Sequence, residues 1–264
     1  MACASLWAAS YTGVVTWDRA RPAREGAAEL TVMTYNVNFG VAGDASTLEA
    51  IAAGDADVVL LQETHTAWER AMRARLGGMY PHMRFGAPES MPAGGLAVLS
   101  RWPFELTHVS PSDGGFFYAW RVVLHTPRGD VQALNLHLRP QVSDGGSLLV
   151  GRFTTGPNRL RELTRHRATL AGELPTIVAG DFNEDERGDA VRSLTEAGMR
   201  SALAEFAPGA MTWRWLVGPF TVRQRFDHVV YDPARFECLH ARVSPAGASD
   251  HLPVIARLRW RAPR

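Results

Sequence analysis

Short runs of apolar and β-branched residues alternate along the chain with segments whose apolar residues recur at helical spacing. Residues 30–37 (LTVMTYNV) and 57–63 (DVVLLQE) are nearly continuous apolar runs, which predict two buried β-strands. After the second run, Trp68, Met72 and Leu76 recur every four residues and predict an amphipathic helix. The domain is therefore expected to begin with βα units.

The same alternation continues to the end of the chain. Further strands are predicted at 95–101, 116–125, 131–138, 175–183, 225–232, 236–244 and 251–260, and further helices at 47–53, 158–171 and 189–197. The Gly- and Ser-rich stretch 139–157 is predicted to be a loop. Some strands lead into helices and others into Pro/Gly turns, which indicates mixed sheets. About ten to twelve strands of this kind fit an α/β fold with two packed sheets flanked by helices.

The composition agrees with one globular domain. The chain has 264 residues, of which 46% are hydrophobic, and this is enough for a sizeable core. Arginine supplies all 28 basic residues, and the 27 acidic residues leave a net charge of +1. This balance excludes a disordered polyelectrolyte and a strongly basic nucleic-acid coat protein. It does not exclude a nuclease whose phosphate contacts are local and metal-assisted.

Residues 1–29 are expected to be an N-terminal extension, and the domain is expected to span 30–264. The first 17 residues carry no charge, and three interpretations stay open: a segment docked on the domain, part of a membrane or export segment, or a frayed end. No uncharged apolar run reaches the length of about 18 residues that a membrane-spanning helix needs. Cys3 and Cys238 are expected to be free thiols and leave the cellular compartment open.

Polar residues stand where the predicted strands end. They are Asn36, Asn38, Glu63, His137, Asp181, Asn183, Asp227, His228, Asp250 and His251. Several have an ordinary alternative, such as a turn cap for Asn36, a helix N-terminus for Glu63 or a core position for His137. The residues of 181–183 could form an Asx-turn, and those of 250–251 could cap a strand. Because α/β sheets bind ligands at their strand ends, we expect these residues to form one crevice.

Six motifs carry a resemblance to a known family. TYNVN, LLQET, NLHL, GDFN, FDHVVY and SDHLPV occur in this order, and together they resemble the motifs of the endonuclease/exonuclease/phosphatase superfamily. The resemblance covers about residues 30–260 and is most specific at GDFN and SDH. It implies a four-layer α/β sandwich, in which two packed mixed sheets are flanked by helices and the site lies at one edge.

The resemblance also implies a metal site. Glu63 is expected to be the main Mg²⁺ ligand, with Asn36 beside it and Asp250 close to the metal. Asn38 occupies a position that is often Asp in the family, so no second ligand is inferred there. Mg²⁺ suits this set because the ligands are oxygen atoms and no thiolate competes, and Mn²⁺ is an expected substitute.

The remaining residues are expected to act on the substrate. Asp181 resembles the carboxylate that orients or deprotonates the attacking water, and Asn183 resembles the amide that donates to a phosphate oxygen. His251 would contact the phosphate or transfer a proton, while Asp227 would hold His251 in orientation. His137 matches a second histidine, which serves the phosphate or the leaving oxygen.

The chemistry of a phosphate ester explains why such residues occur together. The ester is anionic and repels a water nucleophile, so a hard divalent cation held by oxygen ligands is needed to neutralise the charge. A base must stand near the water, and donors must reach the equatorial oxygens. Carboxylates, amides and histidines supply all of these, so we expect hydrolysis of a phosphodiester or phosphomonoester by metal-activated water.

The substrate stays open between nucleic acid and a lipid or small-molecule phosphoester at the cell envelope. Four arginines either clamp phosphate or lie on solvated surface: Arg139, Arg152, Arg159 and Arg161. Four aromatic residues either contact bases or lipid, or pack in the core: Trp213, Trp215, Phe220 and Phe226. Apolar residues of the 139–157 loop favour lipid: Leu148, Leu149, Val150 and Phe153. The near-zero net charge does not favour a nuclease.

The sequence also gives expectations for the partner, the oligomeric state and the location of the protein. The expected partner is the phosphate-ester substrate. The uncharged N-terminus is expected to lie near a membrane, and the protein is expected to be a monomer. A cytoplasmic or cell-envelope location is open, with a preference for the envelope. A binding protein that keeps the fold without turnover is the alternative of a different class.

Overall fold

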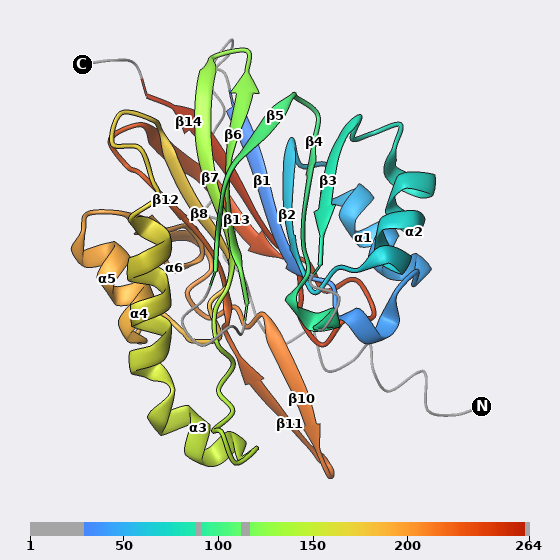
Figure 1. The fold of residues 1–264 in the computed structure, drawn as a ribbon, viewed down its shortest axis with the longest axis vertical. Coiled ribbons are helices and arrows are strands. Elements are labelled where there is room, and N and C mark those ends of the chain that lie inside the picture. Colours follow the sequence, from blue (N-terminus) through green and yellow to red (C-terminus); the bar gives the residue numbers. More distant parts are fainter. Residues whose placement is uncertain (1–28, 88–90, 112–116, 262–264) are drawn as a thin grey trace.

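Two six-stranded β-sheets pack face to face, with helices on their outer faces (Figure 1). The computed structural model describes residues 29–87, 91–111 and 117–261. This arrangement confirms the predicted α/β sandwich of two mixed sheets flanked by helices. The predicted N-terminal extension lies outside the described residues, apart from Glu29, and so does Cys3.

The first sheet has the strand order β13–β14–β1–β2–β4–β3. Its strands are β13 (Phe236–Val243), β14 (Val254–Trp260), β1 (Glu29–Asn36), β2 (Val58–Gln62), β4 (Leu96–Ser100) and β3 (His82–Gly86). Strands β1 and β2 are parallel and are connected through helix α1 (Ala45–Ala53), whereas the other neighbours are antiparallel. Helix α2 (Thr66–Leu76) follows β2, and both helices cover the outer face of this sheet.

The second sheet has the order β5–β6–β7–β8–β12–β9. Its strands are β5 (Phe104–Ser110), β6 (Ala119–Thr126), β7 (Gly129–His137), β8 (Thr176–Asp181), β12 (Asp227–Tyr231) and β9 (Arg200–Ser201). Strands β7 and β8 are parallel, and the other neighbours are antiparallel. Helices α4 (Gly156–Arg167) and α5 (Asp189–Glu196) pack on the outer face, and α6 (Ala202–Phe206) follows β9.

Side-chain alternation along the strands divides the core into layers. Val32 and Leu60 point between the two sheets, whereas Met33 and Leu61, their neighbours in sequence, point toward α1 and α2. The second sheet packs in the same way against α4 and α5. Because these strands are buried on both faces, they are the continuous apolar runs that the sequence shows.

Several elements differ from the sequence prediction. The described residues contain fourteen strands, more than the predicted ten to twelve. Five of them match no predicted range: β3, β5, β9 and the two strands at 213–217 and 220–224. Strands β3 and β5 lie at sheet edges and carry mostly partly exposed or exposed side chains, so they lack the apolar run of a buried strand. The stretch predicted as a loop contains helix α3 (Leu148–Thr154), whose first turn is capped by the Ser147 hydroxyl.

A separate two-stranded hairpin projects from the lower end of the molecule in Figure 1. It consists of β10 (Trp213–Val217) and β11 (Phe220–Gln224). The sequence left open whether the aromatic residues of this region pack in the core. Core packing is right for Phe226, which is 4% exposed. It is wrong for Trp215 and Phe220, which are 47% and 72% exposed.

In the described part of the chain, every helix is too short or too polar to span a bilayer.

Candidate active site

Six strand ends meet at one edge of the sandwich, and each brings a polar side chain there. The side chains are Asn36 (end of β1), Glu63 (after β2), His137 (end of β7), Asp181 (end of β8), Asp227 (start of β12) and His251 (before β14). The parallel pairs β1–β2 and β7–β8 bring their carboxyl ends together. Strands β12 and β14 run antiparallel to their neighbours β8 and β1, so they begin at this same edge. Strand direction therefore brings these predicted site residues to one edge of the sandwich.

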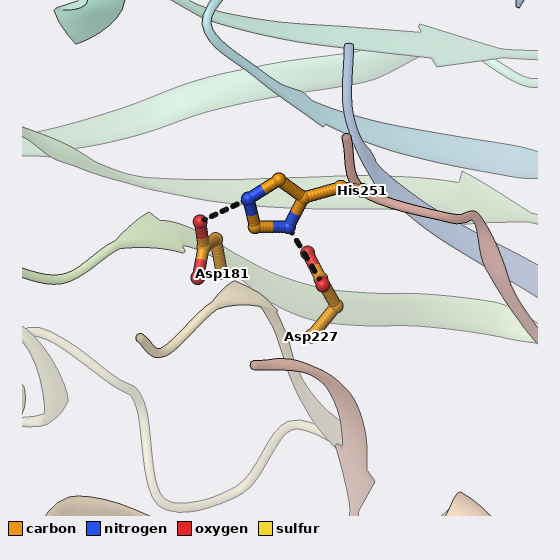
Figure 2. Close-up of side chains that lie close together, drawn as sticks. All are labelled: Asp181, Asp227 and His251. Atoms are coloured by element: carbon orange, nitrogen blue, oxygen red, sulfur yellow. Dashed lines mark hydrogen bonds and ion pairs between the residues drawn. The ribbon is translucent and has the colours of Figure 1, made fainter. Parts of the chain in front are cut away.

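His251 lies between two carboxylates (Figure 2). Its Nδ1 is 2.9 Å from Asp227 Oδ2, and its Nε2 is 3.6 Å from Asp181 Oδ2. Burial lowers the pKa of His251, but the carboxylates of Asp227 and Asp181 outweigh burial and raise this pKa to about 10. The ring is therefore positively charged at neutral pH. Asp227 lies where an orienting role requires it, and the role itself remains a prediction.

His137 approaches the same Asp181 carboxylate, with its Nε2 3.5 Å from Oδ2. The Phe117 ring stacks on the His137 imidazole, with 3.9 Å between centroids and 10° between planes. Burial, with a further contribution from charged His251, lowers the pKa of His137 to about 3. Burial also raises the pKa of Asp181, against the opposite effect of His251. One carboxylate thus stands between a neutral and a charged histidine.

Asn36 connects Asp181 to Glu63. Its Nδ2 donates to Glu63 Oε1 at 2.9 Å and to Asp181 Oδ2 at 3.1 Å. The backbone N–H of Phe39 donates to the other Glu63 oxygen at 3.2 Å. Burial raises the pKa of Glu63, and these donors offset only part of the effect. Glu63 is therefore a carboxylate that a nearby cation would stabilise.

Asp250 is held by two donors from distant parts of the chain. Asn38 Nδ2 donates to Asp250 Oδ1 at 2.8 Å, and Trp213 Nε1 donates to Oδ2 at 3.1 Å. The amide at position 38 makes a contact that the carboxylate often found there in the family could not make, because a carboxylate has no N–H. The sequence reasoning missed the role of Trp213, since nothing in the spacing links residue 213 to residue 250.

The Asn183 side chain lies beside Asp181. Its backbone N–H donates to Asp181 Oδ1 at 2.8 Å, and its Nδ2 donates to the Leu138 carbonyl at 2.9 Å. The amide carries a second N–H that can serve another acceptor. Gly180 makes this geometry possible: its φ is 149°, and an added Cβ would lie 1.9 Å from the Leu136 carbonyl oxygen. Only glycine allows β8 to approach β7 this closely beside the site.

Unusual backbone conformations gather at the same edge. In the described part of the chain, four residues other than glycine have positive φ: Asn38 (58°), Asp55 (48°), Glu63 (60°) and Asn183 (53°). Three of these four belong to the predicted site. Such conformations cost about 1–3 kcal/mol each and persist only where the surrounding structure imposes them, which is typical of functional sites.

Two groups of residues are candidates to hold a cation. Asp181, Asp227 and His251 offer ligand atoms within 4.8 Å of one another, but both nitrogens of the charged His251 ring already face these two carboxylates. Glu63 and Asp250 have no ion-pair partner among the described residues, and the charge of Asp250 raises the pKa of Glu63 further. With Asn36 they form an oxygen-only set, which suits Mg²⁺.

The four arginines considered as phosphate clamps differ in environment. Arg159 is buried, and its Nε donates to Glu184 Oε2 at 2.8 Å, so it is not available to a substrate. Arg139 pairs with Asp144. Arg152 and Arg161 are exposed on α3 and α4. Glu184 was missed by the sequence reasoning, although it directly follows the GDFN motif.

Comparison with known proteins agrees with this geometry. A sequence model described as "Endonuclease/Exonuclease/phosphatase family" matches residues 33–251, a span that includes every predicted site residue. The chain belongs to this family. The endonuclease/exonuclease/phosphatase family includes metal-dependent phosphoesterases and nucleases. No curated protein matches the chain.

Solved structures share the fold of this family member. An endonuclease/exonuclease/phosphatase from Beutenbergia cavernae DSM 12333 is 25% identical, with a TM-score of 0.67 over 88% of this chain and 72% of that one. TDP2 from D. rerio, solved with a single-strand DNA product, is 16% identical, with a TM-score of 0.67 over 88% and 99%. SmcL is 17% identical, with a TM-score of 0.63 over 87% and 98%. The last two show likeness of fold alone.

Proposed function

We propose that this protein hydrolyses phosphoester bonds with water as the nucleophile and a divalent cation as cofactor. The observation that carries the proposal is the convergence of Asp181, His251 and Asp227 beside the pair formed by Asn36 and Glu63. The family assignment supports the same class of reaction. A binding protein without turnover would not need a charged histidine, a neutral histidine and strained backbone at one point.

Glu63 and Asp250 would hold the cation, with Asn36 beside them. Both are carboxylates without an ion-pair partner in the described part of the chain, and oxygen ligands of this kind favour Mg²⁺, with Mn²⁺ as the substitute. When bound, the cation would neutralise charge on the phosphate and favour attack by water. Burial raises the pKa of Glu63, so a nearby cation would stabilise its charged form.

The other residues would act on the water and the phosphate. Asp181 has a pKa raised by burial, which makes its carboxylate a stronger base for the water proton. His251 is positively charged and held by Asp227, so it would donate to a phosphate oxygen without first taking up a proton. The second N–H of Asn183 would donate to another phosphate oxygen. His137, neutral and buried, would serve the leaving oxygen.

The Glu63→Gln variant tests this proposal. Glutamine keeps the shape but removes the negative charge, so Mg²⁺ binding measured by calorimetry should weaken at least about tenfold and Mg²⁺-dependent hydrolysis should fall at least about 100-fold. The matched control is Glu49→Gln, a change at an exposed residue of α1, which should alter neither quantity. Full activity of Glu63→Gln at saturating Mg²⁺ would remove the ligand role.

A substrate panel tests the reaction class directly. Plasmid DNA, RNA, sphingomyelin, polyprenyl pyrophosphate and inositol phosphates should be incubated in parallel with Mg²⁺ and with EDTA. At least one should be hydrolysed in Mg²⁺ and none in EDTA. Turnover that is equal in EDTA would contradict the requirement for a cation.

A further inference from the structure

The β10–β11 hairpin exposes an unusual set of apolar side chains. The exposed fractions are 47% for Trp215, 59% for Leu216, 52% for Val217, 72% for Phe220 and 40% for Val222. All five lie toward the turn of the hairpin, which points away from the sandwich in Figure 1. Exposed apolar clusters are rare on soluble proteins and mark surfaces that bind a partner.

The strand register separates this hairpin into two faces. Trp215 lies opposite Val222, and Val217 lies opposite Phe220, so these four side chains share one apolar face. On the other face, Arg214 lies directly opposite Arg223, one register step nearer the sandwich than Trp215. The hairpin is therefore apolar at its tip and basic below the tip.

The arginine pair indicates the charge of the partner. Two cations directly opposite each other destabilise a pair of strands. Neither arginine has a carboxylate partner within the described residues. Arg214 is half-buried and its Nη2 donates to the Ser249 carbonyl at 3.3 Å, whereas Arg223 is exposed. An anionic partner would supply the missing negative charge.

A second element presents apolar side chains at the same end of the molecule. Helix α3 exposes Phe153 at 76% and Val150 at 51%, and Arg152 beside them is also exposed. Both α3 and the hairpin lie at the lower end of the long axis in Figure 1. Two elements with apolar and basic residues at one end suit an extended anionic surface better than a single small ligand.

We propose that the tip of the β10–β11 hairpin docks into the surface of a membrane that contains anionic phospholipid. From Arg214 to Val217 the strand rises roughly 10 Å, at about 3.3 Å per residue. This matches the depth of about 5–10 Å to which interfacial elements enter the boundary between headgroups and acyl chains. The apolar tip would lie at that boundary, with Arg214 and Arg223 at the level of the phosphates.

Unpaired backbone groups limit how deeply the hairpin enters. In a two-stranded sheet the outer edge of each strand has N–H and C=O groups without a strand partner, and these cannot be buried in hydrocarbon. Docking at the interface satisfies this limit, whereas spanning the membrane does not. Single-stranded nucleic acid fits less well, because its bases stack on aromatic rings, and three of the five exposed tip residues are aliphatic.

The hairpin is joined directly to the candidate active site. Trp213, the first residue of β10, donates to Asp250, and the backbone N–H of Arg214 donates to the Asp250 carbonyl at 3.0 Å. The N–H of Leu252 donates to the Thr212 carbonyl at 2.7 Å. Docking would therefore hold the candidate active site close to phosphoesters of the membrane. The docking itself does not depend on the proposed hydrolysis.

Vesicle sedimentation with the full chain tests the proposal. Vesicles of phosphatidylcholine alone are compared with vesicles containing about 30% phosphatidylglycerol, and the wild type should bind the anionic vesicles at least about tenfold more strongly. The double variant W215S/F220S should lose at least about tenfold in binding to anionic vesicles. R214Q/R223Q should lose the preference for anionic lipid. The control Val109→Thr, at a residue that is 45% exposed on β5, should bind like the wild type.

Several outcomes would overturn the docking proposal. One is that the wild-type protein binds anionic vesicles no better than neutral ones. Another is that the W215S/F220S variant binds anionic vesicles as well as the wild type does. A third is that an oligothymidylate binds through Trp215 and Phe220 while vesicles do not bind. Self-association through these residues without vesicle binding, seen by sedimentation velocity, would also overturn it. If a variant fails to fold, the binding of the wild-type protein to neutral and to anionic vesicles still tests the proposal. Glu63→Gln should bind vesicles normally, so failure of hydrolysis and failure of docking are distinguishable.

Discussion

Two histidines of this site have pKa values shifted in opposite directions by their surroundings. His137 and His251 both approach Asp181 Oδ2, at 3.5 and 3.6 Å, and both are buried. His251 has a second carboxylate, Asp227, and its pKa rises to about 10, whereas burial and the charge of His251 lower the pKa of His137 to about 3. The sequence names both residues, but only their surroundings assign the charged role to one of them.

A third buried histidine predicts a pH dependence of stability. His228 is fully buried, its Nε2 lies 2.9 Å from the Glu184 carbonyl oxygen, and burial lowers its pKa. The unfolded chain binds a proton near the ordinary pKa of about 6.5, and the folded protein does not. The free energy of unfolding should therefore fall as the pH drops below about 6.5, with His228 contributing up to about 1.4 kcal/mol per pH unit.

His228→Gln should make this acid slope shallower, since glutamine keeps an N–H for Glu184 and does not titrate. The measurement is urea unfolding of wild type and variant between pH 4.5 and 7.5. As a control, His82→Gln changes a partly exposed histidine at the edge of the first sheet and should leave the slope unchanged. Parallel curves for wild type and His228→Gln would contradict the expectation.

At the scale of elements, the loop after β8 depends on a buried ion pair from α4. Arg159 and Glu184 are 3% and 4% exposed at their side chains. Arg159 also donates to Thr155 Oγ1 at 2.7 Å, and Glu184 accepts the N–H of Ala190 at 2.6 Å near the start of α5. The pair therefore joins α4, α5 and the segment that carries Asn183.

Arg159→Ala should lower the free energy of unfolding by about 3–5 kcal/mol, because it leaves the Glu184 carboxylate buried without its cation. Chemical denaturation measures this change. The matched control is Arg161→Ala on the exposed side of the same helix, which should stay within about 0.5 kcal/mol of wild type. Equal effects of the two variants would show that the buried pair has no special role.

The elements themselves could be predicted from the sequence to different degrees. Buried strands such as β1 and β2 are continuous apolar runs, and both were predicted nearly at their observed bounds. The edge strands β3 and β5 and the β10–β11 hairpin mix apolar and charged residues, so no period marks them. Helix α3 was hidden in a Gly- and Ser-rich stretch, where local composition favours a loop.

At the scale of the molecule, a polar network joins the two sheets across their apolar interface. Gln62 of β2 donates to Asn135 Oδ1 of β7 at 2.7 Å. The Asn135 amide in turn donates to the carbonyl oxygens of Leu61 and Ala97, at 3.2 and 3.0 Å. Both side chains are fully buried, so each bond contributes to the register between the sheets.

Asn135→Leu should lower the free energy of unfolding by about 2–4 kcal/mol, because Gln62 and two carbonyl groups lose buried partners. Adding Gln62→Leu should recover part of this loss, since both members of the pair are then apolar. Denaturant unfolding of the two single variants and the double variant measures the coupling. Strict additivity would mean that Gln62 and Asn135 are not energetically coupled across the two sheets.

The sequence by itself determined the family, the two-sheet α/β class and the residues that gather at the site. It could do so because buried strands and strand-end polar residues leave local patterns, and because the motifs occur in a fixed order. Tertiary structure alone decided which partners those residues have: the ring of His251 between Asp227 and Asp181, Trp213 on Asp250, and Arg159 in the interior. Charge state and burial depend on contacts between residues far apart in the chain, and no local pattern records them.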